Sequence, residues 1–423
     1  MTVAEIIGAI TSGPLPFRIE AYDGSSIGEG DITFRLENKD ALAYIATAPG
    51  DLGLARAYVM GCLTVHGTHP AHPYDAFDDL RKCYDVISFP KLASVPGLLK
   101  ALKDQDAFRH LPIPVQEQMP GWRKTLHNLN QRRHSKSRDA EAIHHHYDVS
   151  NDFYEQFLGD SMTYTCAVYE TEDSTLEEAQ ENKYRLVFDK LRLKEGDRLL
   201  DVGCGWGGMV RYAAKHGVKA LGVTLSKEQA EWAQAEIKRQ GLQDLAEVRF
   251  QDYRDVKEEG FDAISSIGIL EHIGMKNYES FFTFLYGKLK TGGLMLNHCI
   301  TRPHNRNQRT GQFIGRYIFP DGELTGSGRI IEIMQNVGFD VIHEEDLRPH
   351  YARTLRDWCL NLQENWDKAV EIVGPATARL FGLYMAGSEW GFDHNVVQLH
   401  QVLGQKLPED GTWQLPLRPW WKA

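Results

Sequence analysis

The residues best suited to chemistry lie in the stretch LLDVGCGWGGMV, residues 199–210, where an apolar run reaches Asp201 and then a group of glycines. Gly203, Gly205 and Gly208 fit the pattern G-x-G-x-x-G. Glycine lets the backbone turn sharply and approach a ligand closely, and the helix that follows presents its positive N-terminus to that ligand. The pattern alone allows a nicotinamide, a flavin or S-adenosylmethionine.

The end of the next apolar run discriminates between these ligands. A dinucleotide enzyme places Asp or Glu about 20 residues after the glycines to bind the ribose. Here the run KALGVTLS ends in Thr224, Leu225 and Ser226, and Glu228 comes only inside the next expected helix. The dinucleotide pattern is therefore incomplete.

Two acidic positions favour S-adenosylmethionine instead. Asp201 precedes the first glycine by two residues, where its carboxylate can organise the loop and face the cationic methionine end of the cofactor. Asp252 and Tyr253, in the stretch QDYRD, follow the third strand and can accept the adenine amine and stack on the adenine ring. The sequence therefore predicts an S-adenosylmethionine site.

The elements around these residues predict a doubly wound α/β domain. From about residue 175 onward, expected helices and strands alternate, which is typical of a mostly parallel sheet with helices on both faces. Ligands bind such sheets at the carboxyl ends of the strands. Upstream, short alternating runs such as ITFRLEN, residues 32–38, indicate a small sheet-containing module, and residues 74–102 read as helical and apolar.

A basic segment separates the two parts. The stretch GWRKTLHNLNQRRHSKSR, residues 121–138, contains six cations and no acid, with Trp122 near its start. Such a segment is a solvated linker or a docking site for an anionic lipid surface, and both interpretations stay open. We predict a smaller α+β N-terminal domain at residues 1–118, a basic linker at 119–139 and a catalytic domain at 140–423 with helical lid insertions.

Composition limits the possible partners. The net charge of −11 argues against a general nucleic-acid binder, because affinity for a polyanion comes from Lys and Arg. The six cysteines show no C-x-x-C spacing, which is typical of free thiols in a reducing compartment. The run of histidines at 144–146 does not predict a metal site, because consecutive side chains diverge on a helix or a strand. We expect no bound metal.

Seven motifs resemble, in order and spacing, those of cyclopropane fatty acid synthases and the related mycolic acid methyltransferases: HYDVSNDFYEQFL, MTYTCAVYE, LLDVGCGWGG, LGVTLSKEQ, GILEHIGMKNY, LNHCIT and PHYARTL. The resemblance covers about residues 140 to 400. The stretch DLGLARAYVMGCL is also similar to the smaller domain of the synthases that act on phospholipids.

The resemblance implies methyl transfer from S-adenosylmethionine to the cis double bond of a phospholipid acyl chain such as oleoyl, through a carbocation that a bound bicarbonate ion deprotonates. The implied bicarbonate ligands, which form the catalytic set, are Cys166, Glu271, His298, Ile300 and Tyr351. The implied cofactor contacts, with the loop residues argued above, are Tyr164, Thr165, Asp201, Gly203, Gly205, Gly207, Thr224, Leu225, Gln229, Asp252 and Tyr253.

The expected partners follow from that chemistry. They are the phospholipid bilayer, a separate reductase if the product is a methylene branch, and a second copy in a homodimer. We expect a cytoplasmic enzyme that associates peripherally with the inner face of the plasma membrane. The product, cyclopropane or methylene and methyl branch, stays open. The alternatives are a methyltransferase acting on a small-molecule or sterol acceptor, and a lipid-binding module without catalysis.

Overall fold

The computed structural model divides the chain into two compact units. Unit 1 contains residues 1–120, 311–318 and 355–390, and unit 2 contains residues 121–310, 319–354 and 391–423. The structure describes residues 1–83, 86–88, 94–117, 150–306, 308–309, 311–319, 322–413 and 415–422. The basic segment 119–139 and the histidines at 144–146, singled out in the sequence, lie outside the described residues.

The division differs from the linear one expected from the sequence. Residues 311–318 and 355–390, assigned above to the domain 140–423, belong to unit 1. Packing explains the difference, because Leu383 packs against the N-terminal core and the Arg379 guanidinium donates to the carbonyl of Val59 at 2.9 Å. The chain therefore returns twice to the unit in which it begins.

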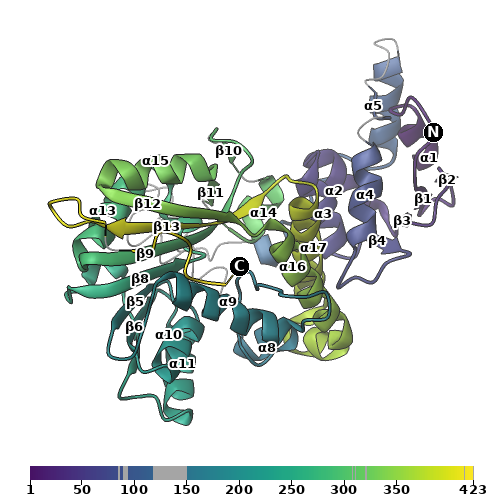
Figure 1. Cartoon of the computed structure of the whole chain (residues 1–423). Helices are drawn as coiled ribbons and strands as arrows, with labels where there is room; N and C mark the ends of the chain where they lie inside the picture. Colours follow the sequence, from purple (N-terminus) through teal and green to yellow (C-terminus); the bar gives the residue numbers. More distant parts are fainter. Residues whose placement is uncertain are drawn as a thin grey trace. The chain divides into compact units, whose positions relative to one another are not determined.

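Unit 2 is built on a sheet of seven strands in the order β12-β13-β9-β8-β5-β6-β7 (Figure 1). Strands β9, β8, β5, β6 and β7 are parallel, and β13 pairs antiparallel with both β9 and β12. The doubly wound, mostly parallel fold predicted from the sequence is thus confirmed. The strands are β5 (Arg198–Val202), β6 (Lys219–Thr224), β7 (Ala246–Phe250), β8 (Phe261–Ile267), β9 (Leu289–Thr301), β12 (Phe339–Asp346) and β13 (Gln398–Lys406).

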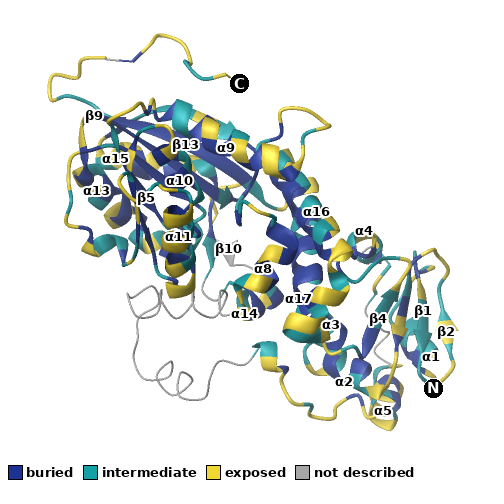
Figure 2. Cartoon of the chain, turned by 90° about the horizontal axis from the view of Figure 1, so that it is seen from below, coloured by how far each residue is buried: buried dark blue, intermediate teal, exposed yellow. Residues whose placement is uncertain are grey.

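Helices cover both faces of this sheet because neighbouring strand residues point to opposite sides. Leu199 of β5 packs with α9, α10 and α11, whereas Leu200 packs with α13 and α15. Strands β5, β6, β8, β9 and β13 are accordingly buried along most of their length (Figure 2), whereas the edge strands β7 and β12 are buried only in part. The helices are α8 (Asn151–Leu158), α9 (Leu176–Lys190), α10 (Gly208–Lys215), α11 (Lys227–Arg239), α12 (Leu270–Ile273), α13 (Tyr278–Lys288) and α15 (Ser327–Val337).

Shorter elements complete unit 2. Strands β10 (Gln308–Arg309) and β11 (Glu323–Leu324) pair with each other, and 3₁₀ turns η3 (Tyr253–Asp255) and η4 (Met275–Asn277) follow β7 and α12. Helices α16 (Arg348–Glu364) and α17 (Trp366–Asp393) contribute residues to both units. The helical geometry of α17 is interrupted at Gly374, which has φ 77°.

Unit 1 contains a four-stranded sheet of order β2-β1-β3-β4, as the alternating runs near the N-terminus predicted. Its strands are β1 (Arg18–Ala21), β2 (Ser26–Ile27), β3 (Thr33–Leu36) and β4 (Leu63–His66). Its helices are α1 (Val3–Gly8), α2 (Lys39–Thr47), α3 (Asp51–Val59), α4 (Tyr74–Cys83), α5 (Val95–Asp104), α14 (Gln312–Tyr317) and the 3₁₀ turn η2 (Val115–Glu117).

The stretch 74–102, which the sequence predicted to be helical, is helical at both ends and not continuous. It forms two helices, α4 and α5, and the second begins at Val95 with Pro96 in its first turn. Proline fits the first turn of a helix, where its missing N–H costs nothing, and it breaks a helix interior. Among the described residues, no helix is long and apolar enough to cross a membrane.

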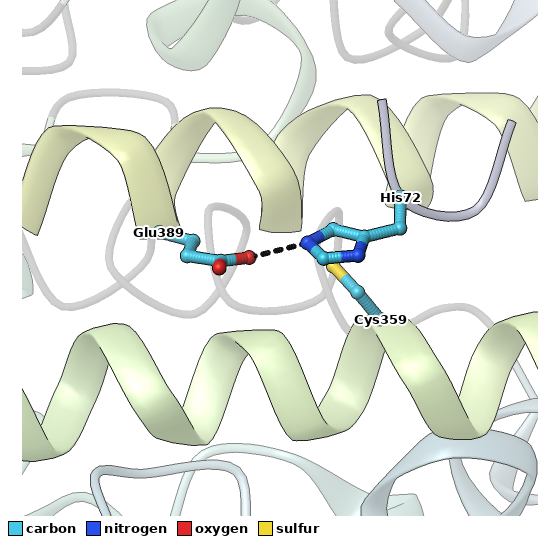
Figure 3. Close-up of side chains that lie close together, drawn as sticks. All are labelled: His72, Cys359 and Glu389. Carbon is cyan, nitrogen blue, oxygen red and sulfur yellow. Dashed lines mark hydrogen bonds and ion pairs between the residues drawn. The ribbon is translucent and has the colours of Figure 1, made fainter. Parts of the chain in front are cut away.

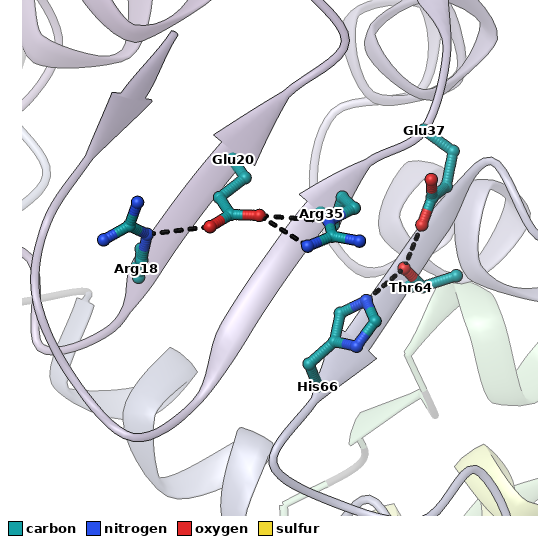
Figure 4. A network of polar contacts seen from close by, with 6 residues as sticks. All are labelled: Arg18, Glu20, Arg35, Glu37, Thr64 and His66. Atoms are coloured by element: carbon teal, nitrogen blue, oxygen red, sulfur yellow. Dashed lines mark hydrogen bonds and ion pairs between the residues drawn. The ribbon is translucent and has the colours of Figure 1, made fainter. Parts of the chain in front are cut away.

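Two polar clusters of unit 1 differ in burial. On the sheet, Glu20 bridges Arg18 and Arg35 at 2.9 and 2.7 Å on an exposed face (Figure 4). Near η2, Glu117 binds Arg56 at 2.6 Å and Arg316 at 3.0 Å, and its side chain is only 3% exposed. The second cluster therefore has more of its charge removed from water than the first.

His72, Cys359 and Glu389 come from three segments of unit 1 and lie close together (Figure 3). Their side chains are of the types that bind zinc. However, His72 Nε2 and Glu389 Oε2 are 2.7 Å apart, which is a hydrogen-bond distance and is shorter than the roughly 3.3 Å separation that two ligands of one tetrahedral zinc ion require. We therefore interpret the contact as a hydrogen-bonded pair that ties the β4–α4 loop to α17.

The contrast between the two carboxylates of unit 1 gives a stability prediction. Glu117→Gln is expected to lower the free energy of unfolding by about 1–3 kcal/mol, because it removes a charged acceptor from two guanidinium groups in a buried site. Glu20→Gln, the matched control on the exposed sheet face, is expected to leave the urea midpoint almost unchanged. Equal shifts of the two midpoints would contradict the assignment.

The same carboxylate has a pH dependence of defined sign. Burial alone would raise the pKa of Glu117, but hydrogen bonds from Arg56 and Arg316 outweigh it and hold the pKa below its usual value. Its contribution to stability is therefore present above the unfolded-state pKa, near 4.3, and is lost as the pH falls below it. The stability difference between wild type and Glu117→Gln should shrink in acid.

Candidate active site

The glycine loop follows β5 at the carboxyl edge of the sheet. Gly203, Gly205 and Gly207 have φ of 73°, 53° and 76°, a region that favours glycine. A Cβ added at Gly203 would lie 1.8 Å from Ile269 Cγ1, so packing inside the protein requires that glycine. A Cβ at Gly205 would meet nothing within 4 Å, so its backbone faces open space. This open backbone fits the cofactor that the sequence predicts.

The third glycine of the sequence pattern, Gly208, has a structural role. It is the first residue of α10, and a Cβ there would lie 1.9 Å from the hydroxyl oxygen of Tyr184 in α9. The glycine therefore permits close packing of α10 against α9. Trp206, which the sequence analysis did not single out, donates from Nε1 to Asn151 Oδ1 of α8 at 3.0 Å and ties the loop to that helix.

The end of β6 forms a compact hydrogen-bonded turn. Thr224 donates from Oγ1 to Gln229 Oε1 at 2.9 Å and accepts from the Ser226 backbone at 3.2 Å. Ser226 in turn caps α11 by accepting from the Gln229 backbone at 3.2 Å. Leu225 lies within this turn and is half-buried. The three predicted cofactor residues therefore share one structural unit beside the glycine loop.

The end of β7 positions Asp252 and Tyr253. The Asp252 carboxylate accepts from the backbone, Nε and Nη2 of Arg254 at 2.9, 2.8 and 2.6 Å. The Tyr253 ring packs edge-on against Phe281 and Phe284. Arg254 was not predicted as part of the site, although it lies in the quoted stretch QDYRD. It fixes the orientation of the carboxylate expected to meet the adenine.

Asp201 is buried within the sheet. Its carboxylate accepts from Ser265 Oγ at 2.6 Å, from the residue directly opposite it on β8. Burial raises the pKa of Asp201 to about 6, and the Ser265 hydrogen bond and nearby Lys183 partly oppose that rise. The carboxylate thus lies below the glycine loop, on the strand that leads into it.

Two side chains of α9 hold the segment 164–166, and the sequence analysis missed both. Lys183 donates from Nζ to Thr165 Oγ1 at 3.0 Å, and Gln180 donates from Nε2 to the Thr165 carbonyl at 2.9 Å. Burial lowers the pKa of Lys183 to about 7, with Cys166 and Asp201 acting in the opposite direction. The sequence signal for them was polar residues at 180 and 183 among the apolar positions of the helix face that α9 buries.

The adjoining residues bind the start of α16. The Ala167 backbone donates to Thr354 Oγ1 at 3.0 Å, and the Tyr169 backbone donates to His350 Nδ1 at 3.1 Å. Tyr351 lies on the same turn and stacks obliquely on Phe392, with ring centroids 4.6 Å apart. The segment that carries Cys166 is therefore joined to the helix that carries Tyr351.

Cys166 is fully buried, and burial raises the pKa of its thiol. Its Sγ lies 3.9 Å from the Leu347 carbonyl, to which it donates. A neutral, bonded thiol is a poor nucleophile. The sulfur therefore has a structural environment.

The remaining predicted residues meet at the ends of β8 and β9. Glu271 of α12 accepts from the Ile300 backbone at 2.7 Å through Oε1. His298 lies two residues before Ile300, on the same face of β9, and hydrogen bonds to Gln401 of β13 through Nδ1 at 3.1 Å. Glu271 Oε2 and His298 Nε2 are both shielded from solvent and have no hydrogen-bond partner. A buried polar atom without a partner needs an explanation, and a bound ion is one of the explanations that a catalytic site provides.

Burial also sets the charge of these two groups. It raises the pKa of Glu271 to about 7, against the opposing effect of the Ile300 backbone N–H. It lowers the pKa of His298 well below its usual value, and the charges of Lys183 and Lys190 lower it further. The imidazole is therefore neutral at pH 7, and the carboxyl is close to its midpoint.

The structure thus groups the predicted residues into two sets at one edge of the sheet. Most of the cofactor set lies at the ends of β5, β6 and β7, and Glu271, His298 and Ile300 of the catalytic set lie at the ends of β8 and β9. Tyr164, Thr165 and Cys166 lie on the segment 164–166 beside α9, and Tyr351 lies on α16. Glu271 is hydrogen-bonded to Ile300, and His298 lies two residues before Ile300 on the same strand. The segment that follows Cys166 binds α16, which carries Tyr351. The roles of the individual residues stay predictions.

The open backbone at Gly205 gives a binding prediction. Gly205→Val should lower the affinity for S-adenosylmethionine at least tenfold, because the new side chain would occupy the space that the loop leaves open. Gly241→Val is the control, since Gly241 also has positive φ, 70°, and open space around its Cβ but lies beyond α11. Isothermal titration should show a loss of affinity for Gly205→Val alone; equal losses would assign the effect to backbone strain.

Comparisons with known proteins agree with the geometry. The model of the mycolic acid cyclopropane synthetase family matches residues 134–402. A probable fatty acid methyltransferase of Mycobacterium tuberculosis is 56% identical over all of this chain and 99% of its own length. A probable fatty acid methyltransferase of Pseudomonas putida is 36% identical over 98% of both chains.

A solved structure shows the same fold. The mycolic acid cyclopropane synthase CmaA1, in a complex with SAH and CTAB, is 35% identical and superposes with a TM-score of 0.59 over 63% of this chain and 98% of its own. The family resemblance read from the sequence is therefore confirmed. The chain belongs to the mycolic acid cyclopropane synthetase family, and it is an S-adenosylmethionine-dependent lipid methyltransferase.

Proposed function

We propose that this enzyme transfers the methyl group of S-adenosylmethionine to the cis double bond of an unsaturated phospholipid acyl chain, and that Glu271 and His298 hold a bicarbonate ion beside that bond. The observation that carries the proposal is the pair of partnerless buried atoms, Glu271 Oε2 and His298 Nε2. S-adenosylmethionine supplies an electrophilic methyl group, and bicarbonate supplies an anionic base.

The donor set fits such an ion. Bicarbonate is planar, carries acceptor oxygens and has one hydroxyl donor, so it requires both donors and an acceptor in its site. A neutral His298 donates one hydrogen bond, and an ionised Glu271 accepts one. Tyr351 and the backbone of Cys166, implied by the family resemblance, would complete the set, while the Ile300 N–H, also implied, is bound to Glu271 Oε1 and orients that carboxylate.

The protein itself offers few nucleophiles near the electrophilic methyl group. The Cys166 thiol is kept neutral by burial, and Lys183 is held by Thr165 with a lowered pKa. An alkene is a weak nucleophile, so catalysis depends on holding the two reactants close together in a dry site. With an exchangeable ion as base, no protein carboxylate or thiolate has to take the proton beside the electrophilic methyl group.

The substrate assignment rests on the relatives. Two relatives that match over nearly their full length are named probable fatty acid methyltransferases, and they span both units. We therefore propose an acyl chain within a phospholipid bilayer, an enzyme associated peripherally with the inner face of the membrane, a homodimer, and a separate reductase if the product is a methylene branch. The basic segment 119–139 supports membrane docking by its composition alone.

The role of Glu271 can be separated from cofactor binding. Glu271→Gln should lower kcat at least about 100-fold and leave the dissociation constant of S-adenosylmethionine nearly unchanged, because Glu271 lies with the catalytic set and not at the glycine loop. Radiolabelled methyl transfer and equilibrium dialysis measure the two quantities. A parallel loss of cofactor affinity would show that Glu271 belongs to the cofactor site.

The acceptor is tested with S-adenosylmethionine that carries a trideuterated methyl group, incubated with dioleoyl phospholipid vesicles. Transfer breaks the S–CD₃ bond and forms a C–C bond. The base then removes one deuteron from the transferred carbon, which gives either a cyclopropane ring or, after a hydride shift in the chain, a methylene branch. We expect acyl chains heavier by CD₂. Ozonolysis followed by mass spectrometry separates the products, because it cleaves a methylene and spares a cyclopropane. Label on the headgroup, or no label in the acyl chain, would contradict the proposal.

A further inference from the structure

His298 can present a lone pair or an N–H to its ligand, depending on its tautomer. In a neutral imidazole one ring nitrogen carries the proton and the other accepts, and the hydrogen bond made by one nitrogen decides the state of the other. Nδ1 of His298 contacts Gln401 Nε2 at 3.1 Å, while Nε2 is the atom left without a partner. The orientation of the Gln401 amide therefore determines what Nε2 offers.

Lys190 fixes that orientation. Its Nζ lies 2.7 Å from the amide oxygen of Gln401, and both side chains are buried. An ammonium group has three donors and no acceptor, so only the oxygen of the amide can face it. The NH₂ of Gln401 must then face His298 and donate to Nδ1. It follows that the proton of His298 sits on Nε2.

Glu345 completes the chain of contacts. Its carboxylate forms an ion pair with Lys190 Nζ, and it is half-buried at the outer end of the chain. Burial lowers the pKa of Lys190, and this ion pair opposes the fall. A charged lysine at the end of α9 is what keeps the amide oxygen turned away from the histidine.

We propose that Glu345, Lys190 and Gln401 are positioning residues that hold His298 in its Nε2-protonated tautomer, so that a hydrogen-bond donor faces the anion in the site. The identity of that anion rests on the proposed function. The tautomer itself rests only on the contacts between Lys190, Gln401 and His298. Gln401 touches neither cofactor nor reacting atoms in this scheme and acts only through the histidine.

The substitution Gln401→Glu tests the tautomer of His298 most directly. Glutamate has the same shape but only accepts, so it would take hydrogen bonds from both Lys190 and His298 Nδ1–H. The proton would move to Nδ1, and Nε2 would turn a lone pair toward the anion. We expect ¹³C-bicarbonate binding, followed by NMR, to weaken at least about tenfold, since the lost contact is a hydrogen bond to a charged group. Affinity for S-adenosylmethionine should not change.

Gln405→Glu is the matched control. Gln405 lies on the same strand and is equally buried. Its side chain donates to the Gly292 carbonyl, with a distance of 3.2 Å, and not to His298. It introduces the same chemical change into the same strand, so a general effect of a buried carboxylate would appear in both variants. Unchanged bicarbonate affinity in Gln401→Glu, or equal loss in both, would overturn the proposal.

The wild-type enzyme provides a test that needs no variant. With ¹⁵N-labelled histidine, the structure requires a pyridine-type shift for Nδ1 and a pyrrole-type shift for Nε2 of His298. The reverse assignment would overturn the proposal. If the tautomer is as required but bicarbonate does not bind the wild type, the proposed function fails while the positioning role of Gln401 stands.

Discussion

The antiparallel pairing of β13 with β9 is the constraint on which the catalytic half of the site depends. Its register places Gln401 opposite His298 and Leu399 opposite Ile300. The Leu347 backbone donates to the Leu399 carbonyl at 2.8 Å, so the same strand also positions the start of α16. Because side chains alternate along a strand, a slip of one residue would turn Gln401 to the other face and leave His298 Nδ1 without its donor.

Burial of polar groups gives this edge of the sheet its electrostatic character. Asp201, Glu271, Lys183 and His298 are each shifted toward the neutral form, and burial is the largest cause in every case. Such groups are costly to bury unless they are hydrogen-bonded. Those with protein partners are satisfied before any ligand binds, whereas Glu271 Oε2 and His298 Nε2 keep capacity for one. A preorganised site of this kind loses little free energy to rearrangement when charge develops.

The proximity of most residues in the predicted cofactor half could be anticipated from the sequence because its signals are local. The glycines, the polar end of β6 and the stretch QDYRD each lie within a few residues of one another, and the five parallel strands follow clear apolar runs. Strands β12 and β13 were not foreseen. The stretch QLHQVLGQK of β13 carries polar residues that the sheet buries, so its alternation does not separate an inner face from an outer one.

The positioning residues were missed for a different reason. Gln401 and Lys190 become meaningful only when segments more than 100 residues apart come together at a fixed register, and single-sequence patterns do not carry that information. Likewise, residues 355–390 were assigned to the catalytic domain 140–423, because nothing in their own apolar pattern shows that the N-terminal core is their partner. Residue types that lie close together in the sequence can be interpreted from the sequence alone, whereas contacts between distant segments cannot.

The two halves of the site require different backbone properties, and they are accordingly built from different parts of the same sheet edge. The cofactor half needs backbone freedom, so it is built from glycines with positive φ and from turns capped by Thr224 and Ser226. The catalytic half needs a single orientation of one imidazole, so it is built on long paired strands and a buried lysine. A doubly wound sheet provides both, because its parallel strands end in loops while its antiparallel extension continues the pairing past them.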